Sequence, residues 1–160
     1  VSAVVAAGLR LVAITGGEPL LQPACPMLAQ RLLDHGHIVL IETNGSLPMD
    51  VLPEGVVRVL DVKCPGSGAC AANLWSNLAV LSPARDEVKF VLADRVDYEW
   101  ARGVVRDRKL ASRARAVLFS PVFGMLAPHR LSGWILEDRL PVRLHLQWHK
   151  YIWPDQPRGV

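Results

Sequence analysis

The sequence predicts an α/β fold built on parallel strands. Short apolar runs with strand character recur along the chain, and segments with helical spacing lie between most of them. The strand-like runs are almost continuously apolar, which is typical of strands covered on both faces. Strands that alternate with helices indicate βαβ units and therefore a parallel sheet.

Each element follows from a local pattern. Residues 1–7 read as the end of a helix, and Gly36 is a stop signal for the first internal helix. No repeat or low-complexity segment divides the chain, so one domain over residues 1–160 is expected. The predicted strands are residues 9–14, 38–42, 56–61, 87–92, 116–120 and 142–146. The predicted helices are residues 27–35, 71–81, 96–108 and 126–140.

Composition excludes several classes of protein. Hydrophobic residues make up 51% and charged residues 21% of the chain, which is typical of a globular domain. No apolar run is long enough to span a bilayer, and no signal peptide is recognised, so we expect a cytoplasmic protein without a membrane partner. The net charge of +3 is too small to indicate a nucleic-acid partner. Basic residues cluster over 102–115 without interleaved aromatic residues, which favours a solvated helix face over a nucleic-acid patch.

The three cysteines form no recognisable framework. Cys25, Cys64 and Cys70 are odd in number and irregularly spaced, which indicates a reducing compartment. No Cys-x2-Cys pair is present, so the pattern predicts ordinary thiols and no self-contained metal site.

Small and polar residues stand where four of the predicted strands end. In parallel α/β sheets the carboxyl ends of the strands meet at one edge, where ligands bind. The sequence therefore predicts a ligand site at that edge. The residues at these ends include Thr15, Gly16 and Glu18, then Glu42 to Ser46, then Asp61 to Lys63, and finally Ser120 and Pro121.

Four segments carry a resemblance to a known family. Thr-Gly-Gly-Glu-Pro-Leu-Leu-Gln (15–22) resembles the Gly-Gly-Glu signature of radical S-adenosylmethionine enzymes. Ile-Glu-Thr-Asn-Gly-Ser (41–46), Asp-Val-Lys-Cys-Pro-Gly-Ser-Gly (61–68) and Leu-His-Leu-Gln-Trp-His-Lys-Tyr-Ile-Trp (144–153) narrow the resemblance to the 7-carboxy-7-deazaguanine synthases of queuosine biosynthesis. The resemblance implies an incomplete TIM-like radical enzyme barrel with parallel strands and outer helices.

The resemblance also implies an activity and its cofactors. The family is a group of carbon–nitrogen lyases that convert 6-carboxy-5,6,7,8-tetrahydropterin to 7-carboxy-7-deazaguanine with loss of ammonia. The implied cofactors are S-adenosyl-L-methionine, a [4Fe-4S] cluster and Mg²⁺. The implied partners are the pterin substrate, an external reductant such as flavodoxin or ferredoxin, and a second copy in a homodimer.

Site residues are implied by matching each motif in turn. The turn of Gly16, Gly17 and Glu18 is expected to meet the methionine end of adenosylmethionine, since a carboxylate suits its ammonium group; an acid at a helix N-terminus is the alternative for Glu18. A plain surface ion pair is the alternative for Lys63, and a simple turn is the alternative for the loop at Ser120. The remaining cofactor-binding residues are Ser46, Asp61, Val62, Lys63, Ser120, Pro121, Val122 and Phe123. The pterin-binding residues are Thr15, Glu42 and His149, whereas His145 is expected to be structural.

The resemblance does not extend to the cysteines that bind the [4Fe-4S] cluster. The family uses three N-terminal cysteines, usually Cys-x3-Cys-x2-Cys, and the spacing of Cys64 and Cys70 is different. We therefore expect a core that lacks the cluster-binding segment, no catalytic or metal residue within it, and an apolar sheet edge that favours instability or oligomerisation. A family role for the C-terminal carboxylate is not carried over to Val160. Two rival functions are a glycyl-radical activase and a non-catalytic module that binds adenosylmethionine or pterin.

Overall fold

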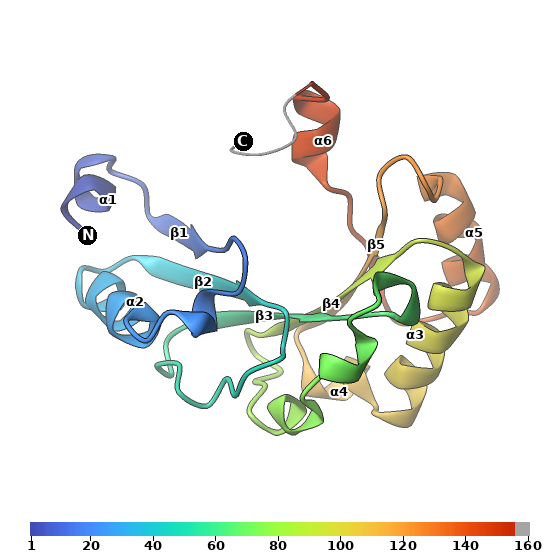
Figure 1. Cartoon of the computed structure of the whole chain (residues 1–160), viewed down its shortest axis with the longest axis horizontal. Helices are drawn as coiled ribbons and strands as arrows, with labels where there is room; N and C mark the ends of the chain where they lie inside the picture. Colours follow the sequence, from blue (N-terminus) through green and yellow to red (C-terminus); the bar gives the residue numbers. More distant parts are fainter. Residues whose placement is uncertain (156–160) are drawn as a thin grey trace.

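The computed structural model describes residues 1–155 and contains one six-stranded parallel sheet. The strands lie in the sheet in their sequence order, and each pairs in parallel with the next. The sheet is open rather than closed into a barrel, in agreement with the predicted incomplete barrel (Figure 1). The strands are β1 (Leu11–Ile14), β2 (Ile38–Thr43), β3 (Val57–Val62), β4 (Glu87–Leu92), β5 (Ala116–Pro121) and β6 (Arg143–Leu144).

All six predicted strands and three of the four predicted internal helices are confirmed, with boundary shifts of a few residues. The N-terminal helical residues are also confirmed. Two short helices, α4 and α6, lie where none was predicted. The helices are α1 (Ser2–Ala6), α2 (Cys25–Asp34), α3 (Arg95–Asp107), α4 (Leu110–Arg113), α5 (Pro128–Glu137) and α6 (Trp148–Ile152).

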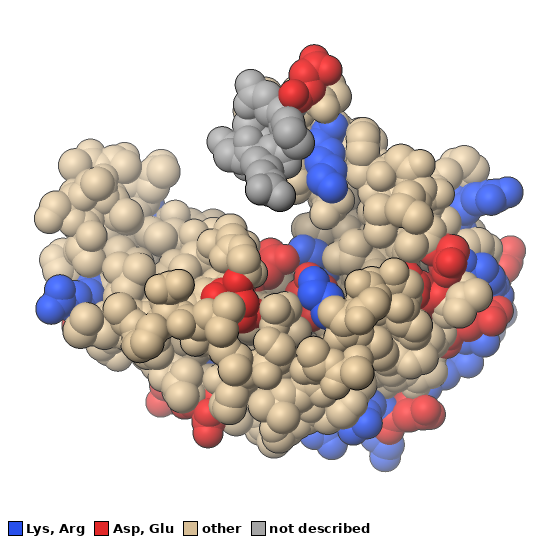
Figure 2. Space-filling model, in the orientation of Figure 1, with Lys and Arg blue, Asp and Glu red and all other residues tan. Residues whose placement is uncertain are grey.

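The helices α2, α3 and α5 cover one face of the sheet and leave the opposite, inner face hollow (Figures 1 and 2). One apolar core forms where α2 packs on β2, around Leu32 and Ile41. A larger core forms where α3 and α5 pack on β3, β4 and β5. At its centre the rings of Phe90 and Phe119 pack edge to face, with 5.4 Å between their centroids. The expectation of cover on both faces is therefore wrong for β1, in which Leu11 stays 57% exposed.

The predicted helix over residues 71–81 is wrong. The structure has two short 3-10 helices instead, η3 (Cys70–Ala72) and η4 (Trp75–Ala79). Two asparagines account for the difference, because their side chains bind backbone groups of other loops. The Asn73 amide accepts from the Lys63 N–H and donates to its carbonyl, both at 2.9 Å. The buried Asn77 amide accepts from Met49 N and donates to the carbonyls of Gly45 and Leu47. Asparagine side chains that bind backbone in this way compete with helix formation.

The basic segment behaves as the solvated face of α3 and α4. Arg102 donates to both carboxylate oxygens of Asp138 at 2.9 Å, and Arg108 lies 4.3 Å above the ring of Trp75. These contacts occupy two of the cations, which supports the structural interpretation of the cluster. Among the described residues, no helix has both the length and the apolar character needed to cross a bilayer.

The role of Asn77 gives a stability test. Asn77→Ala removes three hydrogen bonds from a residue that is 2% exposed and leaves their backbone partners without it. We expect a loss of roughly 2–4 kcal/mol in the free energy of unfolding, measured by urea denaturation. The exposed neighbour Ser76→Ala is the control and should change stability by less than about 0.5 kcal/mol. Equal effects of the two substitutions would contradict this explanation of the loop.

Candidate ligand-binding site

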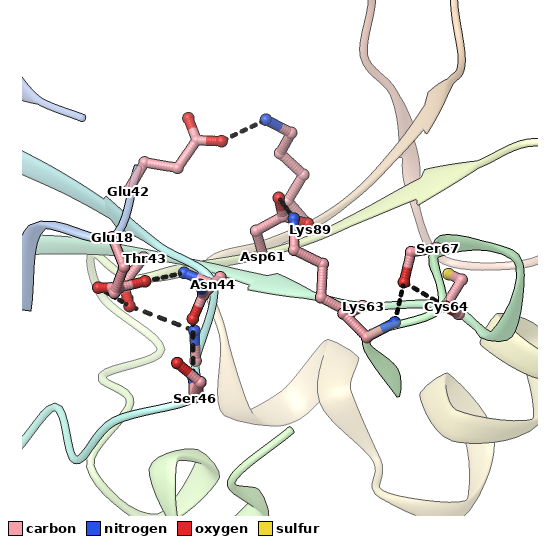
Figure 3. A network of polar contacts seen from close by, with 12 residues as sticks. Glu18, Glu42, Thr43, Asn44, Ser46, Asp61, Lys63, Cys64, Ser67 and Lys89 are labelled. Carbon is pink, nitrogen blue, oxygen red and sulfur yellow. Dashed lines mark hydrogen bonds and ion pairs between the residues drawn. The ribbon is translucent and has the colours of Figure 1, made fainter. Parts of the chain in front are cut away.

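Charged side chains lie on the inner face of three adjacent strands. Because side chains alternate between the two faces of a strand, Asp61 and Lys89 point away from the apolar cores formed by their neighbours. These two residues are partners in the β3–β4 register, and Glu42 on β2 extends toward the same place (Figure 3). The inner face thus carries charge in the hollow that Figure 2 shows.

Three hollows follow one another along the carboxyl edge of the sheet. The central cleft, of about 380 Å³, is lined by residues that include Asp61, Lys63 and Val122. The tail cleft, of about 470 Å³, is lined by Thr15, Glu42, Lys89, and residues 145–149. Glu42, Lys89 and Gln147 belong to both clefts, so the two hollows are adjacent.

The third hollow lies beside the glycine turn. This glycine cleft, of about 430 Å³, is lined by Thr15 to Pro19 and by residues from α2, and it shares Thr15 with the tail cleft. Gly16 and Gly17 adopt φ values of 95° and 54°, which are strained for residues with a side chain. An added Cβ at either position would meet no atom of the described residues within 4 Å, so these residues leave the backbone open on the ligand side of the turn.

Four buried polar atoms near these clefts have no hydrogen-bond partner among residues 1–155. They are Asp61 Oδ1, Ser120 Oγ, His145 Nδ1 and Gln147 Oε1. Three of these residues line the central or the tail cleft, and Ser120 pairs in the sheet with Val91 of the central cleft. A buried polar group without a partner is costly, so such a cluster is typical of a site that a polar ligand completes.

Glu18 ties the ends of β1 and β2 together. Its carboxylate accepts hydrogen bonds from the Thr43 hydroxyl and the Asn44 N–H, both at 2.7 Å, and from the Leu20 N–H at 3.0 Å. It also caps the short 3-10 helix η1 (Pro19–Leu21), which is the structural alternative considered for this residue. A carboxylate has about four acceptor positions, so these bonds leave room for one more donor.

The third strand leads into a loop that is held from α3. The Asp97 carboxylate accepts from Gly66 N at 2.8 Å and from Ala93 N at 3.1 Å. Lys63 Nζ lies 2.7 Å from Asp61 Oδ2, so the ion pair given above as the alternative for Lys63 is present. Both residues also line the central cleft. The loop therefore presents a neutral ion pair to that cleft.

Lys89 and Glu42 form a second ion pair, with 2.5 Å between Nζ and Oε1. His145 lies in the tail cleft with both of these residues, and its backbone N–H donates to the Phe119 carbonyl at 2.9 Å. Burial, and then the positive charge of Lys89, lower the pKa of His145 below its usual 6.5. The imidazole is therefore neutral at pH 7, with one ring nitrogen available to a ligand.

The remaining predicted site residues are placed less uniformly. His149 lines the tail cleft and Val122 the central cleft, whereas Ser46 lines none of the three hollows. Phe123 packs on Tyr151 outside the central cleft, with 5.0 Å between the centroids of the two rings. Val62 lines the central cleft and also belongs to the helix-side core, and Pro121 is a buried residue at the end of β5. Residues 156–160, with the C-terminal carboxylate of Val160, lie outside the described residues.

Three of the cleft-lining residues that the sequence did not identify carry polar side chains central to the site. Lys89 and Gln147 line both the central and the tail clefts, and His145, expected to be structural, lines the tail cleft. One signal for Lys89 was available, because a charged residue inside the otherwise apolar run Val88 to Leu92 must face something other than a core. No comparable signal distinguishes Gln147 within an irregular tail.

The cysteines do not fit an iron–sulfur cluster. Within residues 1–155, no three metal-ligating side chains come together. Burial raises the pKa of both Cys25 and Cys64, so these thiols stay protonated, and a cluster binds thiolates.

The clamp on the central loop can be tested with two glycines. An added Cβ at Gly66 would lie 2.7 Å from the Asp97 carboxylate, so Gly66→Ala should lower the free energy of unfolding by about 1–3 kcal/mol. Gly103 lies inside α3 with no atom within 4 Å of such a Cβ, so Gly103→Ala should raise stability by about 0.5–1 kcal/mol. Thermal or urea unfolding measures both. Two effects of the same sign would contradict the proposed clamp.

The neutral state of His145 predicts a pH dependence. Its folded-state pKa lies below 6.5, so below pH 6.5 the unfolded chain binds the proton first. Stability should therefore fall as pH falls through the interval between 6.5 and the folded-state pKa. Titration of the ring proton by NMR gives the folded pKa, and His145→Asn should remove this part of the slope. A midpoint above 6.5 would show that the cleft does not disfavour the charged ring.

Comparison with known proteins identifies the family. No family model matches the chain. Proteins named 7-carboxy-7-deazaguanine synthase are similar to it over most of its length. The protein from Koribacter versatilis is 44% identical, with 94% of this chain and 72% of that protein aligned. The protein from Chlorobaculum tepidum is 44% identical over 93% of this chain and 68% of its own length, and that from Methanospirillum hungatei is 40% identical over 95% and 64%. The chain therefore belongs to the 7-carboxy-7-deazaguanine synthase family.

Proposed function

We propose that this protein functions as a 7-carboxy-7-deazaguanine synthase in the biosynthesis of queuosine precursors. The reaction converts 6-carboxy-5,6,7,8-tetrahydropterin to 7-carboxy-7-deazaguanine with loss of ammonia. The observation that carries the proposal is the row of clefts at the carboxyl edge of the sheet, where several buried polar atoms lack partners within residues 1–155. The names of the similar proteins favour this synthase over a glycyl-radical activase.

We assign adenosylmethionine to the glycine turn and the central cleft. The open backbone of Gly16 and Gly17 suits the methionine end, and Glu18 has one acceptor position left for its ammonium group. Adenosylmethionine bound here would supply the radical that begins the reaction once one electron from the cluster cleaves its carbon–sulfur bond. Asp61 Oδ1, which has no hydrogen-bond partner among residues 1–155, is placed to accept from a ribose hydroxyl, while the ion pair with Lys63 orients that carboxylate.

The loop after β5 is assigned to the adenine. Ser120 offers a buried hydroxyl that has no partner among the described residues, and Val122 gives apolar cover at the central cleft. The backbone N–H of Val122 already donates to Leu92 at 2.9 Å, so hydrogen bonds to the base must come from other groups of this loop. Pro121 and Phe123 complete the predicted segment.

We assign the pterin to the tail cleft. Thr15, Glu42 and His149 line it from three different elements, as a substrate held by several groups would require. The Glu42 carboxylate suits the N–H donors of a pterin ring, and a hydroxyl such as Thr15 can donate or accept. The reductant, the homodimer, the cluster and Mg²⁺ remain part of the proposal, and none of residues 1–155 is assigned to the cluster or to Mg²⁺.

Binding of adenosylmethionine tests the assignment without any need for catalysis. Isothermal titration calorimetry of the chain should detect binding, and Asp61→Asn should weaken it about tenfold or more because a charged acceptor is lost. The control is Asp107→Asn, which changes an exposed carboxylate at the end of α3 and should leave the affinity unchanged. Binding that is unaffected by Asp61→Asn would move the ribose away from the central cleft, and a chain that folds but binds no adenosylmethionine would contradict the proposal.

A further inference from the structure

Lys89 is a buried cation at the junction of the central and tail clefts. It is 9% exposed, it lines both clefts, and its only ion-pair partner within residues 1–155 is Glu42. A buried ammonium is costly unless it is paired and hydrogen-bonded. The position of Lys89 on the inner face therefore depends on this one carboxylate.

The ion pair spans three strands. Glu42 starts from β2 and Lys89 from β4, and β3 lies between them with Asp61 on the same face (Figure 3). Asp61 does not compete for Lys89, because its own cation is Lys63 at 2.7 Å. Asp61 and Glu42 therefore each have a separate lysine that fixes the direction of the carboxylate.

The pairing leaves part of Glu42 for a ligand. Oε1 accepts from Lys89, while Oε2 accepts no hydrogen bond from residues 1–155, and the side chain is 32% exposed. An unpaired carboxylate at this depth would have several rotamers available. An ion pair restricts that freedom before the ligand arrives, which reduces the entropic cost of binding.

We propose that Lys89 is a positioning residue of the ligand site, whose ammonium holds Glu42 in one orientation so that its second oxygen accepts from the N–H groups of a 2-aminopyrimidinone ring. The inference rests on the proposed function, since a pterin carries such a ring. Such a ring has two neighbouring N–H donors on one edge. A carboxylate whose orientation is already fixed can accept hydrogen bonds from both. Lys89 acts through Glu42 and does not itself contact the ring.

A direct contact is the competing explanation for any effect of Lys89. Its ammonium could instead bind the carboxylate of the ligand, since it has hydrogens beyond the one given to Glu42. The two roles differ in their dependence on the ligand. A positioning role affects pterins with and without a carboxylate alike, whereas a direct contact affects only the carboxylated one.

The test measures binding of two probes, 6-carboxypterin and unsubstituted pterin, by their fluorescence. Lys89→Met should weaken the binding of both about tenfold or more, and Lys89→Arg should restore most of the affinity. Glu42→Gln should weaken binding similarly, and the double variant should be no weaker than Glu42→Gln alone. Lys109→Met changes an exposed lysine at the start of α4 that lines neither cleft, and it should leave the affinity for both probes unchanged. Additive losses in the double variant, or a loss confined to 6-carboxypterin, would overturn the positioning role.

A measurement without ligand separates this inference from the proposed substrate. His145 lies in the tail cleft, and the charged groups that act on it are Lys89 and Glu87 of β4 and Glu42 of β2. In Lys89→Met the pKa of His145 should rise, because the cation that lowers it is gone and Glu42 is left unpaired. The NMR titration should show this shift between about pH 5 and 8. Wild-type protein that binds neither pterin would overturn the proposed substrate, whereas a His145 titration unchanged by Lys89→Met would overturn the role of Lys89.

Discussion

Parallel pairing in sequence order is the constraint on which the rest of this structure depends. It brings every strand's carboxyl end to the same edge, so residues as distant as Thr15 and His149 line one cleft. The Glu18 carboxylate strengthens the weakest part of this arrangement, because it joins the end of exposed β1 to Thr43 and Asn44 at the end of β2. A carboxylate that bridges two strand ends can therefore shape the site even where it does not contact the ligand.

The inner face is organised as pairs of opposite charge rather than as isolated groups. Two ion pairs, Asp61 with Lys63 and Glu42 with Lys89, give the inner face no net charge from these four residues while orienting their carboxylate acceptors. Such a surface suits a ligand that has both donors and charge, because the protein groups are fixed before binding and need little reorganisation. The neutral state of His145 follows from the same arrangement, since the ring lies beside a cation in a partly buried cleft.

The strands could be predicted from sequence because their apolar runs are short, β-branched and separated by clear stop signals. The helix expected over residues 71–81 could not, because its apolar spacing gives no sign that Asn73 and Asn77 bind backbone in distant loops. The same limit applies to the site. Motifs at the strand ends identified Asp61 and Thr15, whereas Lys89 and Gln147 enter the clefts through sheet register and the course of the tail. Contacts that depend on three-dimensional pairing leave little trace in a single sequence.

The central claim is that the carboxyl edge of the sheet, and not the helix-covered face, binds the adenosyl and pterin ligands. The most direct measurement is a two-dimensional amide NMR titration of the protein with adenosylmethionine and then with 6-carboxypterin. The account predicts the largest shifts at the amides of Gly16, Gly17, Lys63 and His149, with little change in α5 and in the C-terminal half of α3 (residues 101–107). Shifts concentrated on those two segments, or saturable binding that leaves the strand ends unperturbed, would contradict it.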